Sequence, residues 1–204
     1  MKRNHAGPAA IPPVPAGGRH EWLRRGVVWG SAAALGAAPL LWWFVSPEAA
    51  ILALVATQTP YWWATVIPNC GWCEPVVRKF VTDRREVWLT LDDGPDPEET
   101  PRVLALLARH GIKAGFFLIG ERARRHPELV REIAAGGHLL GNHTQTHPAG
   151  RFWGLSSARL AREVDACSAA LAAAGVAPPR MFRAPVGLAS PRLFPLLHRR
   201  GLRT

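Results

Sequence analysis

Hydrophobic and polar residues follow two different patterns along this chain. Residues 27–45 form an uncharged run that is long enough to cross the apolar core of a bilayer, and residues 49–67 form a second run of similar length that contains Gln58 and Pro60. From Glu86 onward, short apolar runs alternate with longer segments that mix apolar and charged residues. The first pattern is typical of membrane helices, and the second is typical of a domain in which helices connect parallel strands.

The second pattern predicts the individual elements of an α/β domain. Strands are expected over residues 87–91, 115–119, 138–140 and 181–183. Helices are expected over residues 97–110, 127–135, 156–174 and 191–200. A glycine follows the end of each of these helices, as expected for residues that stop a helix. Because strands alternate with helices, the strands should be parallel and joined by crossover connections.

The two apolar runs predict a membrane hairpin over residues 21–68. Residues 1–20 before it are rich in Pro and Gly and are expected to be a disordered tail. Residues 69–85 after it are expected to be a linker to the α/β domain over residues 86–204. A cleavable signal peptide is the alternative, but its apolar core is normally shorter, and here a second apolar run follows directly.

Basic residues around the hairpin predict its orientation. Arg24 and Arg25 precede the first apolar run and Arg84 and Arg85 follow the second, whereas the loop between the two runs carries no basic residue. The positive-inside rule then places both flanks, and the α/β domain, on the cytoplasmic side of a bacterial-type inner membrane. If the second run does not span the bilayer, the domain faces outward instead.

The composition is strongly basic, with a formal net charge of +10. Such a charge permits a nucleic-acid-binding interpretation, but the arginines are scattered over predicted helices and no nucleic-acid-binding module accompanies them. Solvated helix faces and positive charge beside the membrane segments explain the excess better, so no nucleic-acid partner is expected. A basic nucleic-acid-binding protein remains a competing class.

The three cysteines do not form a disulfide framework. Cys70 and Cys73 make a C-x-x-C pair, which could indicate redox chemistry or half of a zinc site. The pair follows a hydrophobic run and no second pair follows it, so an incidental or structural role is the preferred interpretation. Cys167 stands alone in a predicted helix.

Residues able to do chemistry follow the predicted strands. Asp92 and Asp93 come after the first strand, His143 and His147 after the third, and Arg183 at the fourth. In a βα barrel the carboxyl ends of the strands form the edge where active sites assemble. One Asp and two His make a facial set of metal ligands with open positions, and the other Asp could act as a general base. A polar turn and two surface histidines are the simpler alternative.

The sequence motifs in these segments resemble those of the polysaccharide deacetylases, the NodB-homology family of carbohydrate esterases. The family motifs T-(F/L)-D-D-G-P, H-(S/T)-x-x-H and R-x-P-x-G are matched in order by residues 90–95, 143–147 and 183–187. The resemblance covers about residues 84–204. It implies an α/β fold, an incomplete (β/α) barrel of the NodB-homology type, preceded here by the two-helix membrane hairpin.

The resemblance also implies roles for the metal-site residues. Asp93, His143 and His147 would bind Zn²⁺ or a similar divalent ion. Asp92 would accept the proton of the attacking water, and Arg183 would orient Asp92 and keep its carboxylate ionised.

Three more residues receive roles through the same resemblance. The backbone N–H of Val186, next to Pro185, would stabilise the oxyanion and contact the substrate. Thr144 would fix the histidine loop. Many family members have an aromatic residue where Val186 stands, so stacking of a sugar at this position is not expected from the sequence.

The C-terminal part departs from the family pattern. The family continues with further strands and an L-x-H motif whose His is the general acid, whereas this chain stops at Thr204. The segment Leu196-Leu197-His198 also matches L-x-H. It lies in the predicted helix directly after the third motif, however, so His198 is expected to be a surface residue. The sequence therefore predicts a truncated form of a longer enzyme, with an open sheet edge at its end.

These expectations combine into one functional hypothesis. The protein would be a membrane-anchored, metal-dependent hydrolase that removes an N-acetyl or N-formyl group from an amino sugar. A cytoplasmic domain would suit a lipid-linked glycan, and an outward-facing one would suit peptidoglycan or another cell-surface polysaccharide. The alternative is a non-catalytic, membrane-anchored fragment that binds only metal or glycan. No protein partner is expected.

Overall fold

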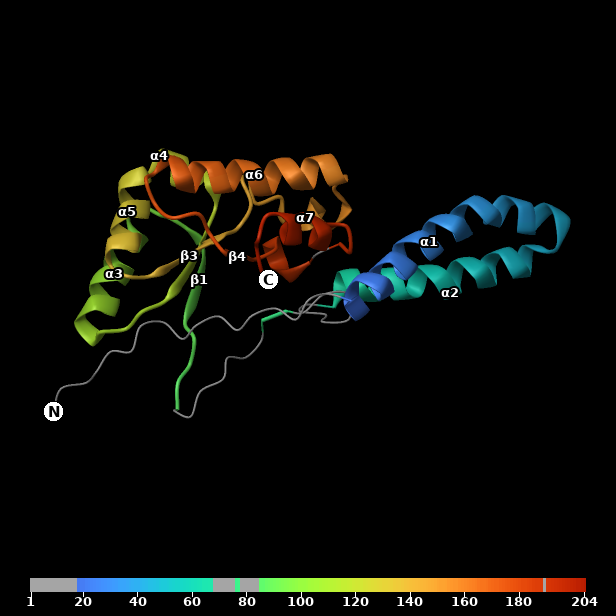
Figure 1. Cartoon of the computed structure of the whole chain (residues 1–204), viewed down its shortest axis with the longest axis horizontal. Helices are drawn as coiled ribbons and strands as arrows, with labels where there is room; N and C mark the ends of the chain where they lie inside the picture. Colours follow the sequence, from blue (N-terminus) through green and yellow to red (C-terminus); the bar gives the residue numbers. More distant parts are fainter. Residues whose placement is uncertain (1–17, 68–75, 78–84, 189) are drawn as a thin grey trace.

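The computed structural model describes residues 18–67, 76–77, 85–188 and 190–204 (Figure 1). Nearly all of the predicted tail over residues 1–20 and most of the predicted linker over residues 69–85 lie outside the described residues. The C-x-x-C pair of Cys70 and Cys73 lies outside them as well.

The N-terminal part consists of two helices that lie side by side, α1 (Gly18–Phe44) and α2 (Pro47–Val66). The turn between them is set by Ser46, whose side chain accepts a hydrogen bond from the Ala49 N–H at 3.1 Å while Pro47 opens α2. Among the described helices, α1 alone is long and apolar enough to cross a membrane, over Glu21–Phe44, and α2 is not. Two adjacent helices are thus present, but a hairpin in which both helices span a membrane is not confirmed and stays a prediction.

A polar side chain of each helix donates a hydrogen bond to the backbone of the other helix. The Ser31 hydroxyl donates to the Thr57 carbonyl at 3.0 Å, and the Gln58 amide donates to the Ser31 carbonyl at 3.1 Å. Pro60 lies inside α2 without ending it. The Gln58 side chain, which interrupts the second apolar run, thus faces the other helix.

The remaining residues form a parallel sheet with helices around it (Figure 1). The sheet has the order β1-β2-β3-β4, and all neighbouring strands are parallel. Its strands are β1 (Thr90–Gly94), β2 (Gly115–Leu118), β3 (Leu139–Asn142) and β4 (Met181–Phe182). The helices are α3 (Glu99–His110), α4 (Gly120–Arg125), α5 (Pro127–Ala135), α6 (Ser157–Ala173) and α7 (Leu193–Arg199), with short 3-10 turns η1 (Ala149–Gly154) and η2 (Pro185–Gly187). The predicted α/β class with parallel strands is confirmed.

The first strand differs most from its prediction. It was expected over residues 87–91, but its pairing with β2 begins at Thr90 and continues to Gly94. Asp92 and Asp93 therefore lie inside the strand, at an irregularity in its register between Leu91 and Gly94, rather than after it. The extent of a strand depends on where its neighbour offers hydrogen-bond partners, and the apolar pattern of residues 87–91 does not contain that information.

Three short elements were not predicted, namely α4, η1 and η2. Each is six residues or fewer, too short for a helical period of apolar residues to be recognised. The N-terminus of α4 is fixed by backbone hydrogen bonds from Gly120 and Glu121 to the carbonyls of Thr144 and Gln145, at 3.0 and 2.9 Å. A side chain on Gly120 would collide with Gln145 and with the backbone of Cys167, so this close approach requires glycine.

Two hydrophobic clusters hold the domain together. The first joins the middle of the sheet to α3, α5 and α6, and the second joins η1, α6 and α7 to β4. Phe152, Leu160, Val164, Phe182 and Leu193 of the second cluster are almost completely buried. Each such side chain contributes about 1.5–3 kcal/mol of transfer free energy, so η1 and α7 are held firmly against α6.

The last residues do not leave β4 unpaired. Arg203 forms a parallel bridge with Met181, and its carbonyl accepts a hydrogen bond from the Phe182 N–H at 2.6 Å. The Thr204 carbonyl accepts a hydrogen bond from the Val77 N–H at 2.8 Å. The expectation of an open edge at residues 203–204 is therefore wrong in part, because residue 77 binds there.

Cys167 is predicted to be chemically inert. Its side chain is completely buried and donates to the Leu118 carbonyl at 3.4 Å, and burial raises the pKa of its thiol to about 12. In a variant with Cys70→Ser and Cys73→Ser, native protein at pH 8 should react with a thiol reagent at least about a hundredfold more slowly than denatured protein. Equal rates before and after denaturation would show that the thiol is accessible.

Candidate metal centre and active site

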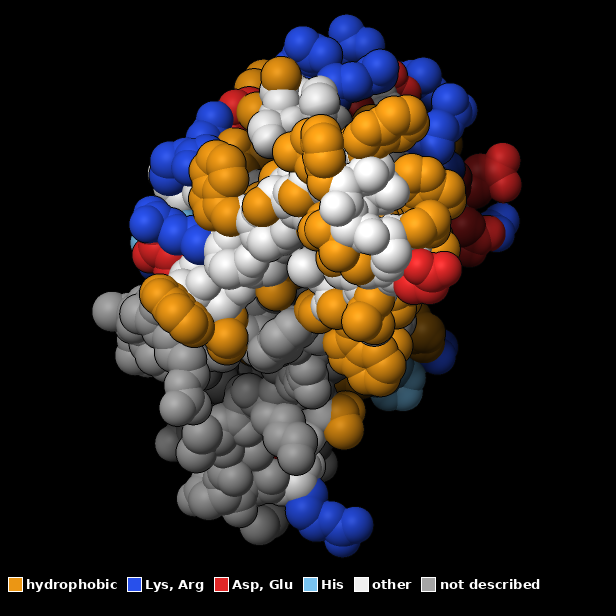
Figure 2. All heavy atoms as spheres, turned by 90° about the vertical axis from the view of Figure 1, so that its right-hand side faces the viewer, with side chains coloured by type: hydrophobic (Ala, Val, Ile, Leu, Met, Phe, Trp, Pro, Cys, Tyr) orange, Lys and Arg blue, Asp and Glu red, His pale blue; other side chains and the backbone are white. Residues whose placement is uncertain are grey.

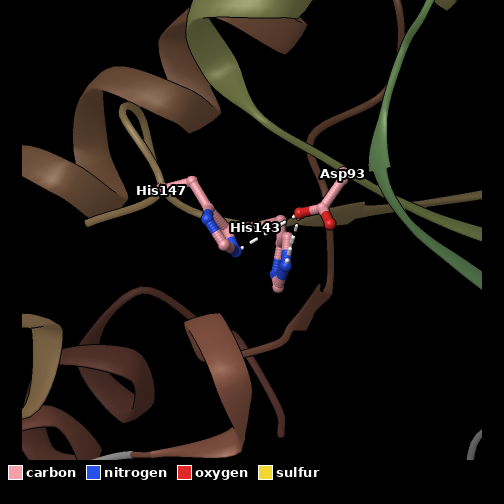
Figure 3. Close-up of side chains that lie close together, drawn as sticks. All are labelled: Asp93, His143 and His147. Carbon is pink, nitrogen blue, oxygen red and sulfur yellow. Dashed lines mark ion pairs between the residues drawn. The ribbon is translucent and has the colours of Figure 1, made fainter. Parts of the chain in front are cut away.

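Asp93, His143 and His147 converge on one point at the carboxyl edge of the sheet (Figure 3). The Nε2 atoms of His143 and His147 lie 3.4 and 3.2 Å from Oδ1 of Asp93. All three ligand atoms lie within 4.8 Å of one another. Figure 3 shows the carboxylate reaching from β1 toward the two imidazole rings, which both come from the segment after β3.

The sheet explains why residues fifty positions apart meet. The carboxyl ends of β1 and β3 lie on either side of β2, and the His143 N–H donates to the Leu118 carbonyl of β2 at 3.0 Å. Asp93, Thr144, His147 and Val186 have φ between 50° and 70°, and they are the non-glycine residues with positive φ in the described part of the chain. A strained backbone conformation of this kind persists only where surrounding contacts hold it in place. Among the described residues it occurs only within the three family motifs, residues 90–95, 143–147 and 183–187.

Asn142 fixes the start of the histidine loop. Its side chain is fully buried, and its amide donates to the Val164 carbonyl at 2.8 Å and to the Ser168 hydroxyl at 2.9 Å. Its carbonyl oxygen accepts the Thr144 N–H at 2.9 Å. Asn142 thus ties the loop to α6 with all of its bonding groups engaged, which makes it a positioning residue.

Two further contacts fix the end of the loop. The Thr144 hydroxyl accepts a hydrogen bond from the His147 N–H at 3.2 Å, as the family resemblance implied. Thr146 donates its N–H and its hydroxyl to the Glu163 carboxylate, at 2.9 and 2.8 Å. Because α6 carries Glu163, the same helix holds both ends of the loop and sets the distance between the two imidazoles.

The surroundings of His143 favour a neutral ring. Its Nδ1 lies 2.8 Å from the Arg183 carbonyl, which can only accept, so Nδ1 carries the proton and Nε2 presents its lone pair to Asp93. Burial lowers the pKa of His143, because the charged ring is poorly solvated there. A neutral imidazole with a free Nε2 is the form that binds metal ions.

Asp92 lies beside the centre and is paired with Arg183. The guanidinium Nη1 donates to Oδ1 of Asp92 at 2.6 Å and to the Thr90 hydroxyl at 3.0 Å. The guanidinium also stacks on the ring of Phe117, 4.0 Å from its centroid. These contacts fix the orientation of the carboxylate, and both side chains are about one-third exposed.

The remaining predicted residues are Pro185, Val186 and His198. Pro185 is buried and Val186 is 58% exposed, both in η2 directly after Arg183. In the described part of the chain, no hydrogen bond joins either residue to the metal ligands. His198 lies exposed in the last turn of α7, as expected for a surface residue.

Sequence reasoning missed Arg122, Asn142 and Glu163 as residues that support the centre. Arg122 lies on α4 and donates to the Asp93 carbonyl at 2.8 Å. Asn142 could have been noticed because it ends a predicted strand directly before a candidate ligand. Arg122 and Glu163 carried no signal, since their partners lie 29 and 17 residues away and only the fold brings them together.

Replacing Arg122 with Met is expected to weaken metal binding by about tenfold or less, because the strained Asp93 backbone loses one hydrogen bond from a charged and exposed donor. Titration calorimetry of Zn²⁺ binding measures the change. Arg124→Met, on the exposed side of the same helix, is the matched control and should bind metal as the unchanged chain does. Equal affinities for the two variants would contradict a positioning role for Arg122.

Comparison with known proteins agrees with this fold and site. The sequence profile described as polysaccharide deacetylase matches residues 79–204, and the chain belongs to this family. A chitooligosaccharide deacetylase of Bradyrhizobium sp. is 43% identical over 109 residues, which cover 53% of this chain and 49% of that protein. A peptidoglycan-N-acetylglucosamine deacetylase of Bacillus cereus is 53% identical over 66 residues, covering 32% of this chain and 24% of that protein.

A solved structure shows the same relationship. The family 4 carbohydrate esterase of Streptomyces lividans, in complex with acetate, aligns with a TM-score of 0.54 and 34% identity. The alignment covers 57% of this chain and 59% of that chain. The chain thus spans about half or less of the curated relatives described above and somewhat more of this esterase.

Proposed function

We propose that this protein is a metal-dependent hydrolase that removes an N-acyl group from an amino sugar of a glycan. The observation that carries the proposal is the convergence of Asp93, His143 and His147 beside an Asp92 carboxylate that Arg183 holds in place. Membership in the polysaccharide deacetylase family supports the same reaction.

The three convergent residues fit a divalent metal ion. Two imidazole nitrogens and one carboxylate oxygen form the donor set that Zn²⁺ accepts in catalytic sites, and three protein ligands leave positions open for other groups. His143 and His147 would bind through Nε2 and Asp93 through Oδ1, the atoms that already face one another. When bound, the ion supplies Lewis-acid polarisation of an acyl carbonyl.

The chain's own residues supply the proton transfer and the orientation. Asp92 accepts the proton of the attacking water, a role for which a carboxylate held in a fixed position is suited. Arg183 fixes that carboxylate from one side, so its second oxygen, Oδ2, is the one that remains for the water. The Val186 N–H would donate to the oxyanion that forms as the carbonyl is attacked. The positive φ of Val186 supports this role, because strained backbone is common where N–H groups are aimed at a reaction centre.

The relatives support an N-acetylated glucosamine polymer as substrate. One is named a chitooligosaccharide deacetylase and another a peptidoglycan-N-acetylglucosamine deacetylase. A lipid-linked amino sugar carrying a formyl or acetyl group is the second substrate class that we propose to test.

The two N-terminal helices are proposed to anchor the enzyme in a bacterial-type inner membrane. Trp29, Trp43, Phe44 and Leu52 are exposed apolar side chains on the helices, and polar Gln58 is bound within the pair. A helix pair in lipid needs apolar side chains on its outer surface and hydrogen-bond partners for its polar groups between the helices. The two helices meet both conditions. With both helices spanning, the positive-inside rule places the catalytic domain in the cytoplasm.

The test supplies Zn²⁺-loaded protein with an N-acetylated chitooligosaccharide, a peptidoglycan fragment and an N-formylated lipid-linked amino sugar. Release of acetate or formate is the expected result. Stoichiometric Zn²⁺ binding without release of either acid would refute hydrolysis by this chain and support the alternative of a membrane-anchored metal- or glycan-binding protein.

A further inference from the structure

Charged residues are divided unevenly between the two halves of the α/β domain. Residues 86–147 contain seven Lys or Arg and nine Asp or Glu, whereas residues 148–204 contain nine Arg and only two acidic residues, Glu163 and Asp165. Both acids are engaged, since Glu163 accepts hydrogen bonds from Thr146 and Asp165 pairs with Arg200 at 2.8 Å. The second half therefore carries a large excess of positive charge.

Five of these arginines form what we call the basic patch. They are exposed, and none has an acidic partner within the part of the chain that the structure describes. The basic patch consists of Arg151 in η1, Arg159 and Arg162 in the first turns of α6, and Arg192 and Arg199 at the two ends of α7. The second hydrophobic cluster packs η1, α6 and α7 together, so the elements that carry these arginines adjoin one another.

The basic patch lies next to the base of the helical hairpin. Trp62, in the last turns of α2, meets Trp153 of η1 edge to face with ring centroids 5.1 Å apart. Trp153 also donates to the Gly150 carbonyl at 3.1 Å, which fixes its ring on η1. Seen along the hairpin, Lys and Arg side chains lie above the hydrophobic side chains in the centre and to both sides of them (Figure 2).

We infer that the basic patch binds the anionic headgroups of the bilayer in which the hairpin is anchored. This inference rests on the proposed membrane anchoring. Tryptophans such as Trp62 and Trp153 belong at the membrane interface, so their contact puts η1 at headgroup depth. Arginines near an anionic leaflet are attracted to it and shift a docking equilibrium by on the order of fivefold each. A nucleic acid would also bind positive charge, but it would not explain why the basic patch lies directly beside an apolar hairpin.

Docking of this kind has a consequence for the proposed active site. η1 begins two residues after the metal ligand His147, and η1 also lies against η2, where Val186 is found. A domain held on the bilayer by η1, α6 and α7 would keep the histidine loop close to the membrane surface. The substrates within reach are then glycans that lie at, or are attached to, that surface.

The experiment uses the full chain reconstituted in lipid nanodiscs of two compositions. One contains phosphatidylcholine alone, and the other also contains about one-third phosphatidylglycerol, which supplies the anionic headgroups. Hydrogen–deuterium exchange of residues 149–162 is measured in both. Exchange in the anionic discs is expected to be slower by tenfold or more, and the difference should disappear in high salt, as screening requires.

Matched variants separate the basic patch from net charge. Arg151→Glu/Arg159→Glu/Arg162→Glu should abolish the lipid-dependent protection, and replacement of the same residues by Gln should reduce it. Arg109→Glu/Arg124→Glu/Arg125→Glu, on α3 and α4 at the other end of the domain (Figure 1), changes the charge equally and should retain it.

Three outcomes would overturn the inference in distinguishable ways. Equal exchange in both lipids, with the chain still in the discs, would refute docking alone. Extraction of the chain from membranes by alkaline carbonate would refute the anchoring and the docking with it. Equal protection by added DNA in zwitterionic discs would assign the basic patch to nucleic acid. Turnover of a soluble chitooligosaccharide, measured on the same samples, tests the hydrolase proposal independently.

Discussion

Replacing Asp92 with Asn is expected to lower the rate of N-deacylation by about 10²- to 10⁴-fold, the range that proton transfer by a positioned side chain contributes. The amide cannot accept a proton from water, yet it has nearly the same shape and can still accept the hydrogen bond from Arg183. Zn²⁺ affinity should be unchanged, because Asp92 is not one of the three converging ligands. Acetate release and calorimetric metal titration measure the two properties separately.

The matched control is Asp165→Asn. Asp165 is also a carboxylate paired with an arginine, at 2.8 Å from Arg200, but it lies on the outer part of α6 away from the centre. This variant should lose at most about 1 kcal/mol of stability, as expected of an exposed ion pair, and should keep its activity. If Asp92→Asn retains activity within a factor of two, Asp92 is not the general base.

Replacing Asp93 with Ala is expected to abolish both specific metal binding and hydrolysis. The variant keeps the two imidazoles but loses the carboxylate that converges with them, so a tight three-ligand site cannot form. The unchanged chain should be stabilised by about 4 kcal/mol when Zn²⁺ is present at 1,000 times its dissociation constant, and the variant should show no such gain. Thermal unfolding with and without Zn²⁺ measures this difference.

Glu98→Ala is the control for this second prediction. Glu98 is an exposed carboxylate five residues along the chain, and its removal should leave the stabilisation by Zn²⁺ intact. A gain in stability with Zn²⁺ that persists in Asp93→Ala would mean that the ion binds elsewhere on this histidine- and cysteine-containing chain, and the proposed centre would be wrong.

Periodicity predicted the regular elements where local signals were strong. Helix α5 was expected over residues 127–135 and is found at Pro127–Ala135, because Pro127 opens it and two glycines follow it. The all-buried run of β2 was likewise placed within one residue of Gly115–Leu118. Local signals failed for β1, whose ends are set by its pairing with β2, and for α4, whose six residues show no period.

The sequence by itself determined the chemistry available: two acids, two histidines and an arginine, in an order and at intervals that resemble those of one enzyme family. Tertiary structure decided how these groups meet, since Arg183 reaches Asp92 across 91 positions and Arg122 reaches Asp93 across 29. It also decided that η1, α6 and α7, which carry the arginines of the basic patch, pack together, and that η1 meets Trp62 of α2. Such contacts depend on which strands and helices pack together, and packing is a property of the folded chain that no local pattern encodes.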